Sequence, residues 1–275
     1  QRLSRGLGDV YKRQIINNQL CGRGAVDMKS SIATFISSAI EFLEENNKFE
    51  SLGSISFIIT SDEEGKAING TKKVVEWLKS NKENIDDCIV GEPTNPDKLG
   101  DMIKIGRRGS YSGNLIVHGI QGHVGYPHLA KNPINSMLKL IQPLSEVELD
   151  KGNENFEPST IMITSIDVGN PSYNIIPAKV NVKFNIRFNN LHSSKSLTKM
   201  LTEKFESLNI SNYSFDYFCN AEPFYTNPGH LVESLKRAIK SITGLVPNLS
   251  TNGGTSDARF ITVSYTHLRA HETIA

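Results

Sequence analysis

Cysteine is scarce in this sequence, with three residues in a chain of 275. Cys21, Cys88 and Cys219 lie far apart and show no C-x-x-C spacing. This pattern argues against a disulfide framework and against a cysteine-based metal motif. We interpret the three thiols as packing residues of a protein from a reducing compartment, and we expect that compartment to be the cytoplasm.

Long apolar runs and a surplus of charge of one sign are also missing. No stretch approaches the roughly 20 apolar residues of a membrane-spanning helix, and no signal-peptide pattern is visible. The formal net charge is +1, which gives no reason to expect nucleic acid or a membrane surface as a partner. The content of 38% hydrophobic and 21% charged residues is typical of a globular protein.

Histidine is absent from the first part of the chain, where the earliest of the seven is His118. His267 and His271 have the i, i+4 spacing of a helical zinc pair, but no acid stands between them. They also fall in residues 263–275, which complete no predicted structural element and which we expect, like residues 1–14, to be a non-native flank. His192 and the other histidines without a motif are expected at the surface or at helix ends.

Three consecutive carboxylates follow a short apolar run. Residues 55–59 (ISFII) predict a buried strand, and Asp62, Glu63 and Glu64 come directly after it. Ligands of open α/β sheets gather at the carboxyl ends of strands, and paired carboxylates can divide the roles of metal ligand and general base. The alternative for such a stretch alone is an acidic surface turn.

Two further acids occupy similar places. Asp27 precedes a helical apolar pattern at residues 32–43, where a helix cap is the alternative, and Glu92 follows the apolar run 88–90. The strand–helix junctions of a parallel sheet converge on one edge, and carboxylates gathered there would repel one another without a cation. The sequence therefore predicts a metal site.

The hydrophobic pattern changes in the middle of the chain. Alternating apolar residues predict strands at 110–119, 159–168, 179–188 and 213–220, and helical patterns predict helices at 132–146 and 194–208. This β-α-β-β-α-β order is the ferredoxin-like arrangement, a helix-covered antiparallel sheet. An α/β pattern then resumes, with a helix at 231–243, a short strand at 248–250 and a glycine-hydroxyl loop at 251–260 that leads into a helix.

These segments together resemble the dizinc aminoacylase/carboxypeptidase-like metallohydrolases. The resemblance rests on residues 22–29 (GRGAVDMK), 60–65 (TSDEEG), 91–94 (GEPT), 105–110 (IGRRGS), 121–128 (QGHVGYPH), 174–177 (NIIP) and 253–257 (GGTSD). It implies an α/β zinc-peptidase-like catalytic domain with an inserted ferredoxin-like α+β dimerisation (lid) domain. The implied boundaries are 15–108 and 222–262 for the catalytic domain and 109–221 for the insertion.

The resemblance implies metal-dependent hydrolysis of the amide bond of a small acyl-amino-acid substrate by a homodimer. Two Zn²⁺ ions per subunit are implied, with Co²⁺ as a possible substitute, and a cis Asp27–Met28 peptide bond. Glu63 would be the general base on the metal-bridging water, and His123 would polarise the scissile carbonyl in the partner subunit's site. The implied metal ligands are Asp27, Glu64 and Glu92, and the implied substrate-binding residues are Arg107, Asn174, Arg187, Gly253, Gly254, Thr255 and Ser256.

One departure from the family concerns histidine. Each zinc ion of the family also takes a histidine, one upstream of the glycine-rich segment and one near the C-terminus, and this chain offers neither. Since catalytic zinc normally has three protein ligands, we expect weak zinc binding and little hydrolysis by this chain as it stands. Two alternatives remain open, another acyl-amino-acid deacylase of the same fold and a non-catalytic homologue that binds or dimerises.

Overall fold

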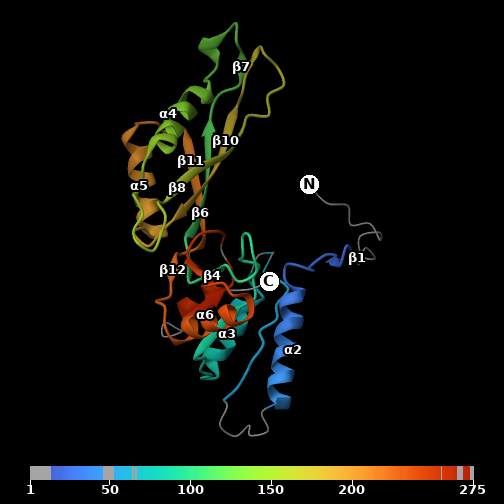
Figure 1. Ribbon diagram of the computed structural model, residues 1–275. Coiled ribbons are helices and arrows are strands. Elements are labelled where there is room, and N and C mark those ends of the chain that lie inside the picture. Colours follow the sequence, from blue (N-terminus) through green and yellow to red (C-terminus); the bar gives the residue numbers. More distant parts are fainter. Residues whose placement is uncertain are drawn as a thin grey trace. The chain divides into compact units, whose positions relative to one another are not determined.

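The chain divides into two compact units in this computed structural model (Figure 1). The described residues are 14–45, 53–63, 65, 67–254, 256–264 and 269–272. The first unit comprises Gln1–Ile105, Thr226–Ser250 and Ser256–Ala275, and the second comprises Gly106–Tyr225 and Thr251–Thr255. The second unit is thus inserted into the first along the chain.

The second unit contains a four-stranded antiparallel sheet in the order β11-β6-β10-β8. The strands are β6 (Gly109–His118), β8 (Thr160–Asp167), β10 (Lys179–Phe188) and β11 (Tyr213–Ala221), and the helices are α4 (Pro133–Glu146) and α5 (Ser194–Ser207). Their sequence order confirms the predicted β-α-β-β-α-β pattern. On β10 every second side chain, from Val180 to Phe188, is buried. Because alternate side chains of a strand point to opposite faces, one face of the sheet is apolar and packs against the helices.

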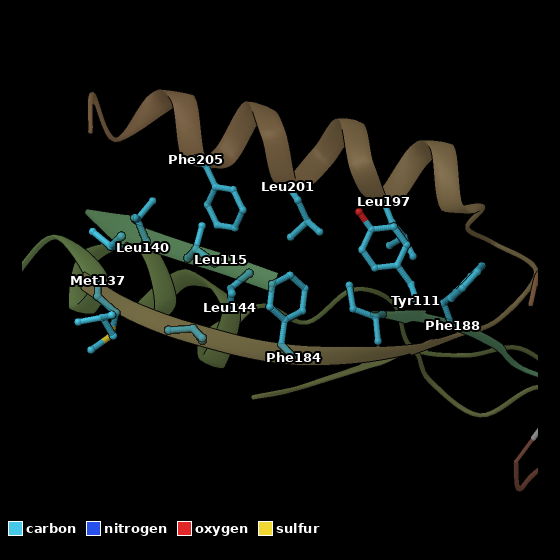
Figure 2. Packing of buried hydrophobic residues seen from close by; sticks show 14 residues of the cluster. Tyr111, Leu115, Met137, Leu140, Leu144, Phe184, Phe188, Leu197, Leu201 and Phe205 are labelled. Carbon is cyan, nitrogen blue, oxygen red and sulfur yellow. The ribbon is translucent and has the colours of Figure 1, made fainter. Parts of the chain in front are cut away.

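The core of the second unit lies between this sheet and its helices. Figure 2 shows Phe205 and Leu201 of α5 pointing toward Leu115 of β6 and Phe184 of β10. The Phe205 ring makes edge-on contacts with two aromatic rings of β11, its centroid lying 5.3 Å from that of Phe215. These buried apolar residues form one continuous cluster, as expected for a sheet covered by helices on one face.

The first unit has a mixed sheet in the order β13-β4-β14-β3. Its strands are β3 (Asp87–Val90), β4 (Met102–Lys104), β13 (Asn248–Ser250) and β14 (Arg269–Glu272), and its helices are α2 (Lys29–Glu45), α3 (Thr71–Ser80), α6 (His230–Thr243) and α7 (Ala258–Ser264). β13 runs parallel to β4, and β14 runs parallel to β3 but antiparallel to β4. In the part of the chain that the structure describes, no helix is long and apolar enough to cross a membrane.

The predicted buried strand at residues 55–59 was wrong. Residues 53–60 have no regular secondary structure, and Ile55 and Ile59 are each 60% exposed. Within the described ranges no strand pairs with this segment, so its apolar side chains have no sheet to pack in. A strand-like sequence does not form a strand without a neighbour that satisfies its backbone hydrogen bonds.

Several short elements were missed by the sequence analysis. A hairpin of β1 (Gln14–Ile16) and β2 (Gln19–Cys21) turns at Asn17 and Asn18, both with positive φ, which is the usual chemistry of a two-residue hairpin. The expectation that residues 263–275 complete no element was also wrong, because α7 ends at Ser264 and β14 pairs within the sheet.

A polar network around Asp150 stabilises the second unit. The Asp150 carboxylate accepts hydrogen bonds from Gly152 N (2.7 Å) and from Nδ2 of the fully buried Asn189 (2.6 Å). His192, which is half-buried one residue before the N-cap of α5, has its Nε2 3.2 Å from Asp150 Oδ2. Burial alone would raise the pKa of Asp150, but hydrogen bonds from Ser159, Gly152 and Asn189 together lower it.

Replacing Asp150 by Asn should lower the free energy of unfolding by about 1–3 kcal/mol near neutral pH, because the buried donors lose a charged acceptor. The folded-state pKa of Asp150 lies below the unfolded value of about 3.9. Its stabilisation is therefore fully present above that value and is lost as the pH falls through the folded pKa. The free energies of unfolding of the two proteins, measured with urea, should become equal below about pH 4. A difference between them that stays the same at every pH would contradict this.

Candidate functional site

Asp27 lies in a tight turn that leads into α2. Gly24 has φ 74°, in the left-handed region that favours glycine, and its carbonyl accepts a hydrogen bond from Lys29 N at 2.9 Å. The Asp27–Met28 peptide bond is cis, which confirms the prediction. The Asp27 side chain is exposed, so its carboxylate is accessible to a ligand.

The segment that carries Glu92 lies against the start of α2. A Cβ atom built on Gly91 would lie 3.0 Å from Ser31 Cβ and 3.1 Å from Met28 Cε. Gly91 therefore allows the end of β3 to approach the turn that contains Asp27, because any larger residue would push the two apart. The structure thus brings together two of the three segments predicted to bind metal.

Glu63 is half-buried in the loop between residue 60 and α3. Glu64 lies outside the described residues. Among the residues that are described, no three His, Cys, Asp or Glu side chains come close enough together to hold a metal ion. The described carboxylates therefore do not complete a metal centre by themselves, and the ligand set stays a prediction.

His123 and Asn174, predicted from separate motifs, lie together in the second unit. β7 (Gly122–His123) pairs with β9 (Ile175–Ile176), and the Asn174 side-chain amide lies 3.5 Å from His123 Nε2. Gly125 N donates a hydrogen bond to His123 Nδ1 at 3.0 Å. Since Nδ1 is an acceptor here, the proton of the neutral ring is on Nε2, which can then donate to a carbonyl oxygen.

Arg107 contacts the backbone of the glycine-hydroxyl loop at residues 251–260. It belongs to β5 (Gly106–Arg107), which pairs with β12 (Phe224–Tyr225), and its guanidinium donates to Asn252 O at 3.2 Å. A Cβ atom on Gly253, where φ is 94°, would lie 2.6 Å from Arg107 Nη1. Arg107 is buried and contacts the loop backbone, and its predicted contact with substrate stays a prediction. The sequence analysis missed Asn252, whose backbone role carries no side-chain signal.

Arg187 presents an unsatisfied donor on the sheet face opposite the helices. Its Nη1 is buried and has no hydrogen-bond partner among the described residues. Burial, and then the positive charge of Arg108, lower the pKa of Arg187. Arg108 itself pairs with Glu157 at 3.3 Å. A buried donor without a partner is unfavourable by about 1–3 kcal/mol, so an anionic ligand at Arg187 would remove a penalty as well as add a contact.

The residues of the glycine-hydroxyl loop differ in exposure: Gly254 is exposed, whereas Ser256 is buried. Gly254 is exposed, and a Cβ atom there would meet nothing within 4 Å, so its backbone is open to a ligand. Thr255 lies outside the described residues. Ser256 is 2% exposed and its hydroxyl accepts a hydrogen bond from Ala258 N at the start of α7. Its geometry is that of a helix cap, and its predicted contact with substrate stays a prediction.

The fold and the motifs define a class of metallopeptidase. Residues 5–269 match the profile of Peptidase family M20/M25/M40, and the chain belongs to this family. Solved structures agree in fold: aminopeptidase PepT from Bacillus cereus has a TM-score of 0.72 at 22% identity, covering 95% of this chain and 67% of that one. An M20 family metallo-carboxypeptidase from Sulfolobus solfataricus has a TM-score of 0.70 at 15% identity, covering 95% and 71%.

Curated relatives are more specific. The chain is 50% identical over 254 residues to succinyl-diaminopimelate desuccinylase from Pelagibacter ubique, covering 91% of this chain and 66% of that protein. It is 50% identical over 243 residues to the enzyme of the same name from Xanthobacter autotrophicus, covering 88% and 63%. The chain thus spans slightly less than two thirds of the length of these relatives.

Proposed function

We propose that the protein containing this chain is a metal-dependent amide hydrolase that removes succinate from N-succinyl-LL-2,6-diaminopimelate, on the lysine and diaminopimelate route in the cytoplasm. The observation that carries the proposal is the 50% identity to desuccinylases over 91% of the chain. The experiment that tests it is succinate release from this substrate by the full-length protein, where no release would overturn it.

The carboxylates of the proposed substrate match the hydrogen-bond donors of the second unit. N-succinyl-LL-diaminopimelate carries several carboxylates, and the half-buried Arg187 has a buried donor, Nη1, without a partner in the described structure. Arginine binds carboxylates through a planar, permanently charged fork. The open backbone at Gly254 offers further amide donors to an anionic group.

His123 would act as a hydrogen-bond donor to the scissile carbonyl. The contact from Gly125 N to Nδ1 leaves Nε2 as the ring nitrogen that can donate. A preorganised donor aimed at the developing oxyanion stabilises the transition state more than the ground state. We propose that His123 does this in the active site of the partner subunit of a homodimer formed through the inserted unit.

The first unit would supply the acids. Glu63 would take a proton from the attacking water and return it to the leaving amine, while Asp27, Glu64 and Glu92 would hold two zinc ions, which cobalt could replace. When bound, such ions supply Lewis-acid chemistry. Among the described residues no three such donors come together, and Glu64 lies outside them, so this ligand set is part of the proposal.

Two other functions make different predictions. Another acyl-amino-acid deacylase of the same fold, such as acetylornithine deacetylase, would prefer an acetylated substrate. A non-catalytic homologue would bind a partner or dimerise without turnover. The complete set of acids argues against this function, because a binding module does not need the proposed base, Glu63.

This chain by itself should bind zinc weakly. With no histidine before His118, the proposed ligands are only the three carboxylates, and each ion would have two protein ligands instead of the usual three. Metal analysis after dialysis against about micromolar free zinc should give well under one ion per chain, with little desuccinylation. Close to two ions per chain with rapid turnover would contradict this.

A further inference from the structure

The loop that carries Glu63 is organised around the carboxylate of Asp62, an acid without an assigned role. Asp62 Oδ2 accepts hydrogen bonds from two backbone amides further along the loop, Ile68 N at 2.6 Å and Asn69 N at 2.9 Å. Both donor residues are exposed, so these amides would otherwise be bonded to water. A single ionised oxygen thus replaces solvent as the partner of both groups.

The backbone of Asp62 closes the same loop from the other side. Its carbonyl oxygen accepts from Gly65 N at 3.2 Å and from Ala67 N at 3.1 Å. The first of these bonds closes a four-residue turn in which Glu63 occupies the second position. Ala67 has φ 51°, a conformation that a residue other than glycine seldom adopts, and the bond to Asp62 O holds it there.

Glycines on both sides make room for the Asp62 side chain. A Cβ atom on Gly65 would lie 2.7 Å from Asp62 Oδ1, and one on Gly70 would lie 3.5 Å from Asp62 Cβ. The loop therefore folds back on itself so that its end, just before α3, meets its beginning. Oδ2 accepts from two loop amides and Oδ1 lies close to Gly65, so both oxygens of the carboxylate face the loop.

We propose that Asp62 is a positioning residue for Glu63: its carboxylate ties Ile68 and Asn69 to the start of the loop and so fixes the turn from which Glu63 projects. The assignment rests on the proposed function for the catalytic role of Glu63, whereas the loop geometry stands independently of it. The acids of the segment 62–64 then have separate tasks, with Asp62 holding the backbone and Glu63 moving a proton.

Amide hydrogen exchange measured by NMR on this chain tests the loop geometry. In the unmodified chain the Ile68 and Asn69 amides should be protected despite their exposure. Asp62→Ala should raise their exchange rates by about tenfold or more, whereas Asp62→Asn, which keeps an acceptor oxygen, should stay within about threefold. Asp86→Ala, which removes an exposed acid elsewhere in the same unit, should change neither amide. Unprotected Ile68 and Asn69 amides in the unmodified chain would overturn the proposal even if Asp62→Ala does not fold.

Kinetics of the full-length protein test the link to Glu63. Asp62→Ala should lower kcat on the order of 100-fold with KM nearly unchanged, because a small displacement of a catalytic group affects the chemical step. Asp62→Asn should restore most of the activity. Equal losses in both variants, with the amides still protected in Asp62→Asn, would overturn the positioning role. No desuccinylation by the unmodified protein would instead overturn the proposed function, and the exchange data would still decide the role of Asp62 in the loop.

Discussion

Glu63→Ala in the full-length protein should lower kcat for desuccinylation by about 10²- to 10⁴-fold, the usual contribution of a general base. The proposed base is not among the proposed metal ligands, so its removal should leave the metal content nearly unchanged. The loss should fall on kcat and kcat/KM alike, because the proton transfer is made only in the transition state. Steady-state kinetics together with metal analysis of the purified variant measure both quantities.

A matched control separates this role from a general effect of removing a carboxylate. Glu148→Ala removes an exposed glutamate from the inserted unit and should leave kcat and KM unchanged. Glu63→Gln keeps the size of the side chain but cannot accept the proton, so it should be as inactive as Glu63→Ala. A Glu63→Gln protein with near-normal turnover would exclude Glu63 as the base.

Phe205→Ala should destabilise the inserted unit by about 3–5 kcal/mol, the usual result of truncating a buried phenylalanine. Phe205 is fully buried, and its ring contacts both Tyr213 and Phe215 of β11. The Phe205 ring lies between α5 and the sheet (Figure 2), and its removal leaves a cavity that neighbouring side chains fill only in part. Urea unfolding of the chain, followed by circular dichroism, measures the change.

The control for this variant is Phe218→Ala on the same strand that Phe205 packs against. Phe218 is 61% exposed, so its removal should change the free energy of unfolding by less than about 1 kcal/mol. Equal effects of the two truncations would contradict the described packing of α5 on the sheet.

The inserted unit was predictable because its sequence pattern and its packing agree. The alternation in β10 predicts its bounds, residues 179–188, and the structure has a strand over the same residues. Each of its strands pairs within the unit and each helix covers the same face, so local pattern and tertiary contacts favour one arrangement. The segment 55–59 shows the opposite case, because its apolar, β-branched residues lack a paired neighbour in the described structure.

The candidate site was predictable only in part. Glycine-rich and acidic motifs predict Asp27, Glu63, Glu64 and Glu92 as site residues, and the close approach of Gly91 to Met28 shows why one of those glycines is needed. What residue types do not encode is which polar atoms meet through the backbone. The contact of Arg107 with Asn252 O and the two amides bound by Asp62 depend on loop geometry, so they became visible only in the structure.

Turnover of two substrates by the full-length protein tests the central claim most directly. With equal concentrations of N-succinyl-LL-diaminopimelate and N-acetylornithine, kcat/KM should favour the succinylated substrate by at least about 100-fold, because a site built to bind a charged group rejects the analogue that lacks it. Release of succinate and LL-diaminopimelate in equal amounts would support the account. A preference for N-acetylornithine, or no hydrolysis of either compound by the metal-loaded protein, would contradict it.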